Sequence, residues 1–144
     1  MTEIEDVLGS FEILGDWDQR YQYLVELGER MPPMPDRYKV EANRVKGCMS
    51  KVWVRAYRDL GDPDLVRYLG DCDTAIIKGV VALLVELLSG RSAKAILGMD
   101  LDGLFQELNL AEHLSPSRHF GVYAIVELMK QQATELTNPV NQVA

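Results

Sequence analysis

The sequence predicts an α+β fold, in which a small antiparallel sheet packs against a layer of helices. Apolar and polar residues alternate only in the middle of the chain, from residue 43 to about residue 70, as they do in strands. On either side, apolar residues recur at about every third or fourth position, as they do in helices. The length of 144 residues fits one domain, so we expect 1–144 to fold as a single domain.

Two helices are expected at the N-terminal end. Residues 3–14 carry an apolar stripe at helical spacing, which ends at Gly15. Asp16 is expected to cap a second helix, and either Gly28 or the proline-rich run 32–35 ends it. Three prolines in this run predict an extended path that leads away from the helix.

The sheet is expected next. Val52 to Arg58 alternate as in a strand with one buried face. The Gly-Asp-Pro-Asp sequence at 61–64 predicts a turn, and residues 65–69 then form the returning strand. A short strand at 43–46 could pair alongside, which would give two or three antiparallel strands.

The second half of the chain is expected to be helical. A helix from 75 to about 88, capped by Asp73 or Thr74, is apolar around most of its circumference and should therefore be the central, buried helix. Gly90 should end it. Further helices are predicted at 92–98, at 101–108 and from Ser115-Pro116 onward, with a frayed tail from about Thr137.

Composition excludes several classes of function. A net charge of −7 disfavours nucleic acid and anionic lipid as partners. The acidic N-terminus does not resemble a signal peptide, and the longest apolar stretch, 75–88, is too short to span a bilayer. Two cysteines make no disulfide framework, and the spacing of cysteines and histidines fits no metal site. We therefore expect a cytoplasmic protein with no membrane, metal or nucleic-acid partner.

Cys48 is the candidate reactive residue. Gly47 before it permits a tight turn with positive φ, which would present the thiol at the rim of a loop. The basic residues Arg44 and Lys46, with Lys51 following, would lower the pKa of the thiol, and the thiolate is the species that attacks a sulfur–sulfur bond. Ser50 could donate a hydrogen bond to that thiolate. The alternative is that Cys48 is a buried, unreactive thiol, as many single cysteines are.

The other polar candidates have simpler explanations. Cys72 lies between two aspartates, which raise a thiol pKa, so a strand-end thiol is favoured over a resolving cysteine. Asp73 is explained by a helix N-cap. Arg118 lies in the first turn of the last helix, where the helix dipole disfavours a cation, so we expect an ion pair or a partner protein to compensate it. His113 and His119 lack the neighbours of a metal site or a catalytic triad.

Three blocks of the sequence resemble the SufE-type sulfur acceptor proteins, including the closely related CsdE proteins. The second block contains the pattern V-x-G-C-x-S-x-V-W around Cys48 and is the most specific of the three. The blocks span nearly the whole chain: 14–28 with the prolines that follow it, 43–53, and 70–73 continuing through 78–79 to 113–118. The pattern does not separate the SufE branch from the CsdE branch.

The resemblance implies a function. Cys48 would take persulfide sulfur from a SufS-type cysteine desulfurase, stimulate that enzyme, and deliver the sulfur to an iron–sulfur scaffold complex. Pyridoxal phosphate would reside on the desulfurase, so this chain would need no cofactor and would not be a stand-alone enzyme. The implied fold is similar to that of the IscU scaffold.

The resemblance also implies roles for single residues. Cys48 would be the acceptor, tucked in a hydrophobic cavity at rest, and Asp73 and Arg118 would act around its loop and at the desulfurase interface. We accordingly expect a mobile loop at about 44–51 that opens on partner contact. Cys72 departs from the family pattern, which has a small residue there, and suggests a Cys48–Cys72 disulfide under oxidation.

Two alternative functions compete with this one. An iron–sulfur scaffold normally offers about three or four protein ligands, and this chain has only two cysteines and two histidines. A regulatory adaptor would bind the desulfurase without transferring sulfur, and its activating effect would survive the loss of the thiol.

Overall fold

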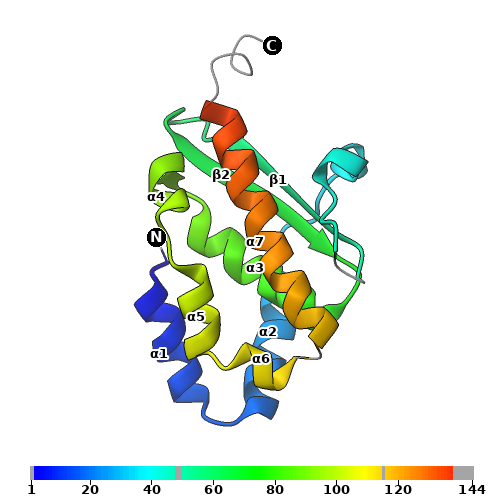
Figure 1. The fold of residues 1–144 in the computed structure, drawn as a ribbon, viewed down its shortest axis with the longest axis vertical. Helices are drawn as coiled ribbons and strands as arrows, with labels where there is room; N and C mark the ends of the chain where they lie inside the picture. The colour runs from blue at the N-terminus through cyan, green and yellow to red at the C-terminus, as the bar shows by residue number, and fades with distance from the viewer. Residues whose placement is uncertain (1, 48–49, 115, 138–144) are drawn as a thin grey trace.

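The structure is a computed structural model that describes residues 2–47, 50–114 and 116–137 (Figure 1). The helices are α1 (Ile4–Leu14), α2 (Trp17–Arg30), α3 (Ala75–Leu88), α4 (Ala93–Leu97), α5 (Leu101–Glu107), α6 (Leu110–His113) and α7 (Pro116–Thr137), with the short 3-10 turns η1 (Asp36–Tyr38) and η2 (Glu41–Asn43). The strands are β1 (Val52–Arg58), β2 (Leu65–Cys72) and β3 (Arg91–Ser92).

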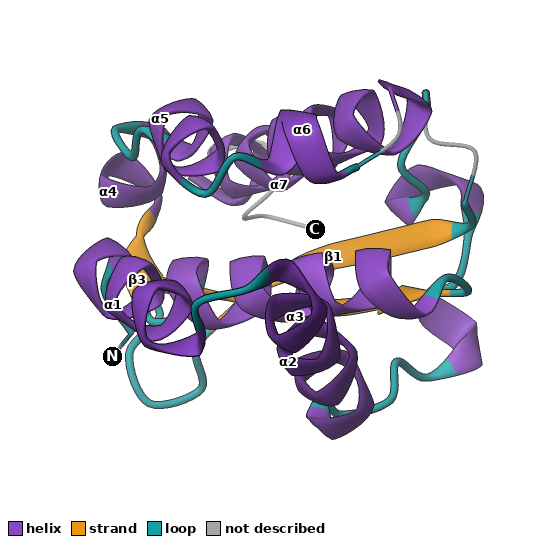
Figure 2. Ribbon diagram, turned by 90° about the horizontal axis from the view of Figure 1, so that it is seen from below, coloured by secondary structure: helices purple, strands orange, loops and turns teal. Residues whose placement is uncertain are grey.

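The predicted α+β class is confirmed. The antiparallel sheet has the order β1-β2-β3, and β1 pairs with β2 along its whole length. Helix α7 runs along the sheet on one side, while α3 passes through the centre of the molecule and α2 packs against α3 from the other side (Figures 1 and 2). The core therefore lies between the sheet and the helices.

Helix α3 is the central helix that the sequence predicts, with the predicted bounds. Its apolar residues are almost all buried, including Ile77, Leu84 and Leu87, each with 0% exposure. α2 crosses it at close range, because a Cβ on Gly79 would lie 2.0 Å from the carbonyl oxygen of Leu24. Of the two predicted ends of α2, Gly28 was wrong. It lies buried against α3 inside the helix, and the helix ends at Arg30 just before the prolines.

The third strand is not where the sequence predicts it. Residues 43–46 form no strand, and only an isolated bridge joins Arg44 to Trp53. The strand beside β2 is instead β3, which pairs with Leu65 and Val66. Two residues are too few to show an alternating pattern, so periodicity could not reveal β3.

The remaining helices follow the prediction with one addition. α4 and α5 lie within the predicted ranges, and α6 was not predicted. α6 follows Asn109, whose φ of 57° is left-handed. α7 begins at Pro116, whereas Ser115 and the tail from residue 138 lie outside the described residues. Within the described ranges, no helix is both long and apolar enough to cross a membrane.

The outer edge of β1 is closed by a side chain of α7. The amide of Gln132, which is 8% exposed, accepts from the N–H of Ala56 at 3.0 Å and donates to the carbonyl of Val54 at 2.8 Å. Gln132 thus satisfies two backbone groups that an edge strand would otherwise leave unpaired.

Replacing Gln132 with methionine should lower the free energy of unfolding by about 1–3 kcal/mol, because the side chain keeps its bulk while both backbone groups lose their partner in a buried position. Urea unfolding followed by circular dichroism measures this change. Gln131→Met, at the neighbouring exposed position, should stay within about 0.5 kcal/mol of the wild type. Equal effects of the two substitutions would contradict this role of Gln132.

Candidate functional site

Cys48 belongs to residues 46–51, here called the Cys48 loop, which connects η2 to β1. Cys48 and Met49 lie outside the described residues, so the site is defined by the two limbs of the loop. At its base, the N–H of Val45 donates to the carbonyl of Val52 at 2.9 Å, and both side chains are buried in the core. The base of the loop is therefore firmly anchored in the core.

Gly47 adopts the conformation that the sequence predicts. Its φ is 83°, a left-handed value that glycine reaches without steric cost. A Cβ at this position would meet nothing within 4 Å, so the backbone angle and not the available space calls for glycine. Gly47 reverses the chain immediately before Cys48.

The second limb of the loop is tied to the connection between β2 and α3. The N–H of Lys51 donates to Asp73 Oδ1 at 2.9 Å, and the N–H of Asp73 donates to the carbonyl of Lys51 at 3.1 Å. The hydroxyls of Ser50 and Thr74 lie 2.6 Å apart, and the Thr74 hydroxyl donates to Asp73 Oδ1 at 3.3 Å. We call these four residues, Ser50, Lys51, Asp73 and Thr74, the Asp73 latch.

Asp73 is therefore not the N-cap of α3, which corrects the role that its position in the sequence predicts. Thr74 occupies the N-cap position, as the other predicted option had it, without a capping side-chain bond. The carboxylate of Asp73 serves the Cys48 loop instead, because the N–H of Lys51 needs an acceptor. The two residues are 22 positions apart, so no local sequence pattern could have revealed this contact.

The latch also engages the hydroxyl of Ser50 in a hydrogen bond. Since the Thr74 hydroxyl has one proton and donates it to Asp73, Ser50 is the donor in the Ser50–Thr74 bond. Donation from Ser50 to Cys48 stays a prediction, and it requires this bond to break.

The basic residues before Cys48 differ in their partners. Lys46 forms an ion pair with Glu41, and both side chains are exposed. Arg44 is half-buried and makes no ion pair with any carboxylate in the described part of the chain. Of the two cations that precede the thiol, Arg44 is therefore the one whose charge is less compensated, and Lys51, which follows the thiol, makes no ion pair among the described residues either.

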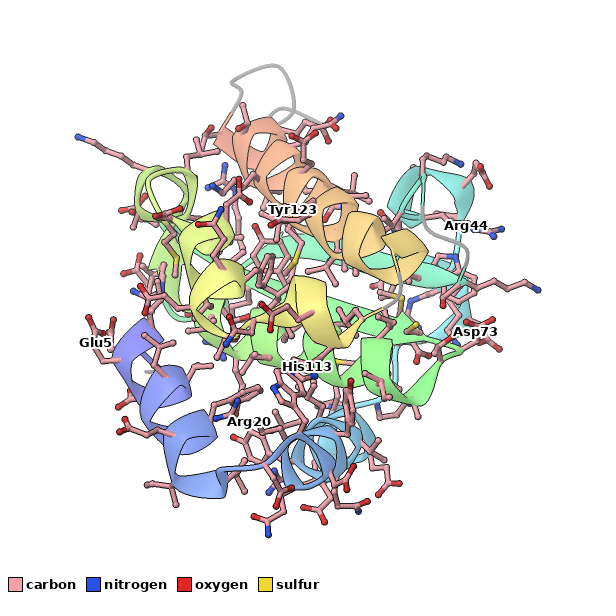
Figure 3. The ribbon with its side chains drawn as sticks, turned by 60° about the horizontal axis from the view of Figure 1, so that its bottom comes forward. Glu5, Arg20, Arg44, Asp73, His113 and Tyr123 are labelled. Carbon is pink, nitrogen blue, oxygen red and sulfur yellow. The ribbon has the colours of Figure 1, made fainter. Side chains whose placement is uncertain are left out.

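Arg118 lies in the first turn of α7, and its side chain is not among the described ones. Figures 1 and 2 place this turn at the same end of the molecule as the start of β1 and of α3. Its ion pair therefore stays a prediction. His113 lies at the end of α6 and stacks on Trp17 with 3.9 Å between the ring centroids, while its carbonyl accepts from the hydroxyl of Tyr21. These contacts fix α6 to α2 (Figure 3).

Cys72 is a buried strand-end thiol, as predicted. It is the last residue of β2, pairs with Val52 and is 6% exposed. The N–H of Thr74 lies 3.4 Å from its sulfur. Cys72 therefore packs directly beneath the base of the Cys48 loop.

Asp71, the residue before Cys72, lies beside two lysine ammonium groups. Its carboxylate, 16% exposed, lies 2.9 Å from Lys39 Nζ and 3.5 Å from Lys78 Nζ, and it accepts from the N–H of Cys72 at 2.8 Å. Burial alone would raise the pKa of Asp71, but the Lys39 and Cys72 hydrogen bonds and the two ammonium charges outweigh it and hold the pKa below its ordinary value.

This shift predicts a pH dependence of stability. Because the pKa of Asp71 is lower in the folded chain, its contribution is fully present above the unfolded value of 3.8 and is lost as the pH falls through the folded value. Asp71→Asn should therefore be less stable than the wild type at about pH 7, and the difference should shrink toward about pH 3. Urea unfolding across this range tests it, with the exposed Asp64→Asn as control, and a gap that widens in acid would contradict it.

Within the described ranges, no three His, Cys, Asp or Glu side chains gather in a way that could hold a metal ion. The described part of the site is the two limbs of the loop, with a glycine turn at Gly47, a base anchored in the core and a latch to the neighbouring strand end.

Comparisons with known proteins define the class to which this fold and loop belong. The family model "SufE: Fe-S metabolism associated domain" matches residues 5–133. An uncharacterised SufE-like protein of Rhizobium meliloti is 35% identical over 135 residues, covering 92% of this chain and 96% of the relative. Another from Rhizobium etli is 32% identical over 135 residues, covering 92% and 90%.

A solved structure has the same fold. The solution structure of a hypothetical protein from Thermus thermophilus matches with a TM-score of 0.75 and 27% identity, covering 92% of this chain and 94% of that one. The chain belongs to the SufE family, whose domain is associated with iron–sulfur metabolism.

Proposed function

We propose that this protein is a cytoplasmic sulfur acceptor. It takes persulfide sulfur from a SufS-type cysteine desulfurase onto Cys48, stimulates the desulfurase by removing that sulfur, and passes it to an iron–sulfur scaffold complex. The observation that carries the proposal is the Cys48 loop of a SufE-family chain, in which Gly47 turns the backbone immediately before the thiol and Val45 and Val52 anchor its base.

The transfer step needs only the thiolate of Cys48 and the partner's persulfide. The thiolate attacks the terminal sulfur, a bond forms between Cys48 Sγ and that sulfur, and the sulfur–sulfur bond of the donor breaks. The cysteine of the desulfurase leaves as a thiolate. The proton on the terminal sulfur stays with that sulfur as it moves to Cys48. The step is neutral in electrons and needs no cofactor on this chain.

The Asp73 latch makes the loop a gate in this proposal. A buried thiol is protected from oxidation but reacts slowly, whereas an exposed one reacts and oxidises. The latch consists of a few hydrogen bonds between the loop and the β2–α3 connection, each worth about 1 kcal/mol. Contacts with a partner can therefore supply enough free energy to open it, and opening also releases the proton of Ser50.

Asp73→Ala should accelerate alkylation of Cys48 by iodoacetamide, because the N–H of Lys51 and the hydroxyl of Thr74 both lose their acceptor. Loss of about 1–2 kcal/mol from the closed state corresponds to roughly a five- to thirtyfold faster reaction. Asp73→Asn retains an oxygen acceptor and should alkylate within about threefold of the wild type. Equal rates for Asp73→Ala and the wild type would contradict the gate.

The release of sulfide from cysteine by a purified cysteine desulfurase tests the proposed function. Adding this protein should raise the turnover of the desulfurase in the presence of a reductant, because the acceptor removes the persulfide that otherwise occupies its cysteine. A turnover that does not change with the concentration of this protein would refute the proposal.

A further inference from the structure

The segment around the Cys48 loop has the opposite charge to the rest of the protein. Residues 36–58 contain seven Lys and Arg against two Asp and Glu, a net charge of +5. The whole chain carries −7, so the remaining residues carry −12. An uneven charge distribution of this kind produces a long-range electrostatic field, which orients a charged partner before contact.

Part of this charge lies on aromatic rings at the outer face of the sheet. Trp53 and Arg55 alternate with the buried Val52 and Val54, so they point away from the core. Lys39 Nζ lies 5.6 Å from the centroid of the Trp53 ring. The Tyr38 ring has the Arg37 guanidinium at 4.7 Å and that of Arg55 at 4.1 Å. We call these five residues, Arg37, Tyr38, Lys39, Trp53 and Arg55, the cation–aromatic face.

Two guanidinium groups of this face are not neutralised. Lys39 pairs with Asp36 and Asp71, but neither Arg37 nor Arg55 forms an ion pair with a carboxylate among the described residues. The hydrogen bond and charge of Arg37, together with the charge of Arg55, hold the pKa of Tyr38 below its ordinary value, which reflects the positive surroundings. Stacking on Tyr38 also restricts both guanidinium groups before any partner binds.

The cation–aromatic face adjoins the Cys48 loop. Arg44, two residues before the loop, forms an isolated bridge with Trp53, and β1 begins directly after the loop. A protein that brings a persulfide to Cys48 along this side of the molecule therefore covers Trp53 and Arg55.

We propose that the cation–aromatic face docks an acidic surface segment of the sulfur-donating cysteine desulfurase. This inference rests on the proposed function of Cys48. Paired carboxylates match the planar donor geometry of Arg37 and Arg55, and the net charge of −12 on the residues outside 36–58 disfavours the approach of an acidic partner to the rest of the molecule. A nucleic acid fits less well, because its extended phosphate backbone would also meet that negative surface.

Binding of the purified desulfurase at low and high salt tests the proposal. Arg37→Gln combined with Arg55→Gln should raise the dissociation constant about tenfold at low salt, and the exposed single variant Arg37→Glu should raise it severalfold. The wild type should lose affinity as salt rises, and the double variant should lose less. Wild-type affinity and salt dependence in both variants would overturn the proposal.

Lys94→Glu is the matched control. It makes the same change in charge as Arg37→Glu at an exposed position of α4, which lies on the opposite side of the molecule from η1 (Figures 1 and 2). We expect the dissociation constant to change less than about twofold, because solvent screens charges beyond about 10 Å at moderate salt. An effect as large as that of Arg37→Glu would indicate net charge alone and would overturn the proposed surface.

Loading of Cys48 by glutathione persulfide separates docking from chemistry. Equal loading of the wild type and both variants from this small donor, with slower loading of the variants from the desulfurase, supports the docking surface. If the wild type takes sulfur from neither donor, the proposed function fails, while the salt-dependent binding still tests the surface. The proposed surface is wrong if the variants keep wild-type affinity for the desulfurase but lose another interaction. That interaction would be either the binding of a labelled single-stranded oligonucleotide or the transfer of sulfur to the scaffold.

Discussion

Replacing Cys48 with serine is expected to reduce sulfur transfer from the desulfurase by at least about a hundredfold, since removal of a nucleophile leaves only background reaction. A serine hydroxyl stays protonated at neutral pH and forms no persulfide. The stimulation of sulfide release should fall to the rate of the desulfurase alone, while binding to the desulfurase persists. Steady-state sulfide production and a binding isotherm on the same preparations measure the two effects.

Cys72→Ala is the control for this substitution. Cys72 is buried under the base of the Cys48 loop at the end of β2, so its loss should cost some stability and leave transfer within a few-fold of the wild type. Two outcomes would contradict the account: stimulation that survives in Cys48→Ser, which would identify a regulatory adaptor, or transfer that depends on Cys72 and not on Cys48.

Gly79→Ala is expected to lower the free energy of unfolding by about 3 kcal/mol or more, at the upper end of the range for overpacked positions. The new Cβ would lie 2.0 Å from the carbonyl oxygen of Leu24 and 2.5 Å from its carbonyl carbon. Both atoms belong to the backbone of α2 and have no side-chain rotation that could relieve the clash. α2 must therefore move away from α3, the central helix of the core. Urea unfolding measures the loss.

Gly9→Ala is the matched control, because Gly9 also lies inside a helix but a Cβ there would meet nothing within 4 Å. This substitution should stabilise the protein by about 0.5–1 kcal/mol, the ordinary gain from alanine in a helix. If Gly79→Ala were tolerated within about 0.5 kcal/mol, the close crossing of α2 and α3 would be wrong.

Local patterns predicted most of the fold. α3 has the predicted bounds because its apolar residues cover most of its circumference and Gly90, whose φ is 86°, follows its C-terminal end. The pairing of β1 with β2 followed from alternation and a proline-containing turn. The misplaced third strand and the missed α6 are short elements, whose formation depends on neighbours that are distant in sequence.

In the site, too, features set by local sequence were predictable and features that depend on distant residues were not. The positive φ of Gly47 was predictable, because it depends on one residue and its successor. The contact of Asp73 with Lys51 and the closure of β1 by Gln132 were not, since each joins segments that only the fold brings together. The net charge of −7 likewise concealed the positive segment at 36–58, because a sum over the whole chain does not show where the charges lie.

Mass spectrometry of the protein after incubation with cysteine and a cysteine desulfurase tests the central claim most directly. The intact chain should gain the mass of one sulfur atom, peptide mapping should place that atom on the peptide containing Cys48, and a reductant should remove it. Cys48→Ser should gain nothing. An unmodified wild-type chain beside an active desulfurase, or a sulfur atom on Cys72 with Cys48 unmodified, would contradict the account.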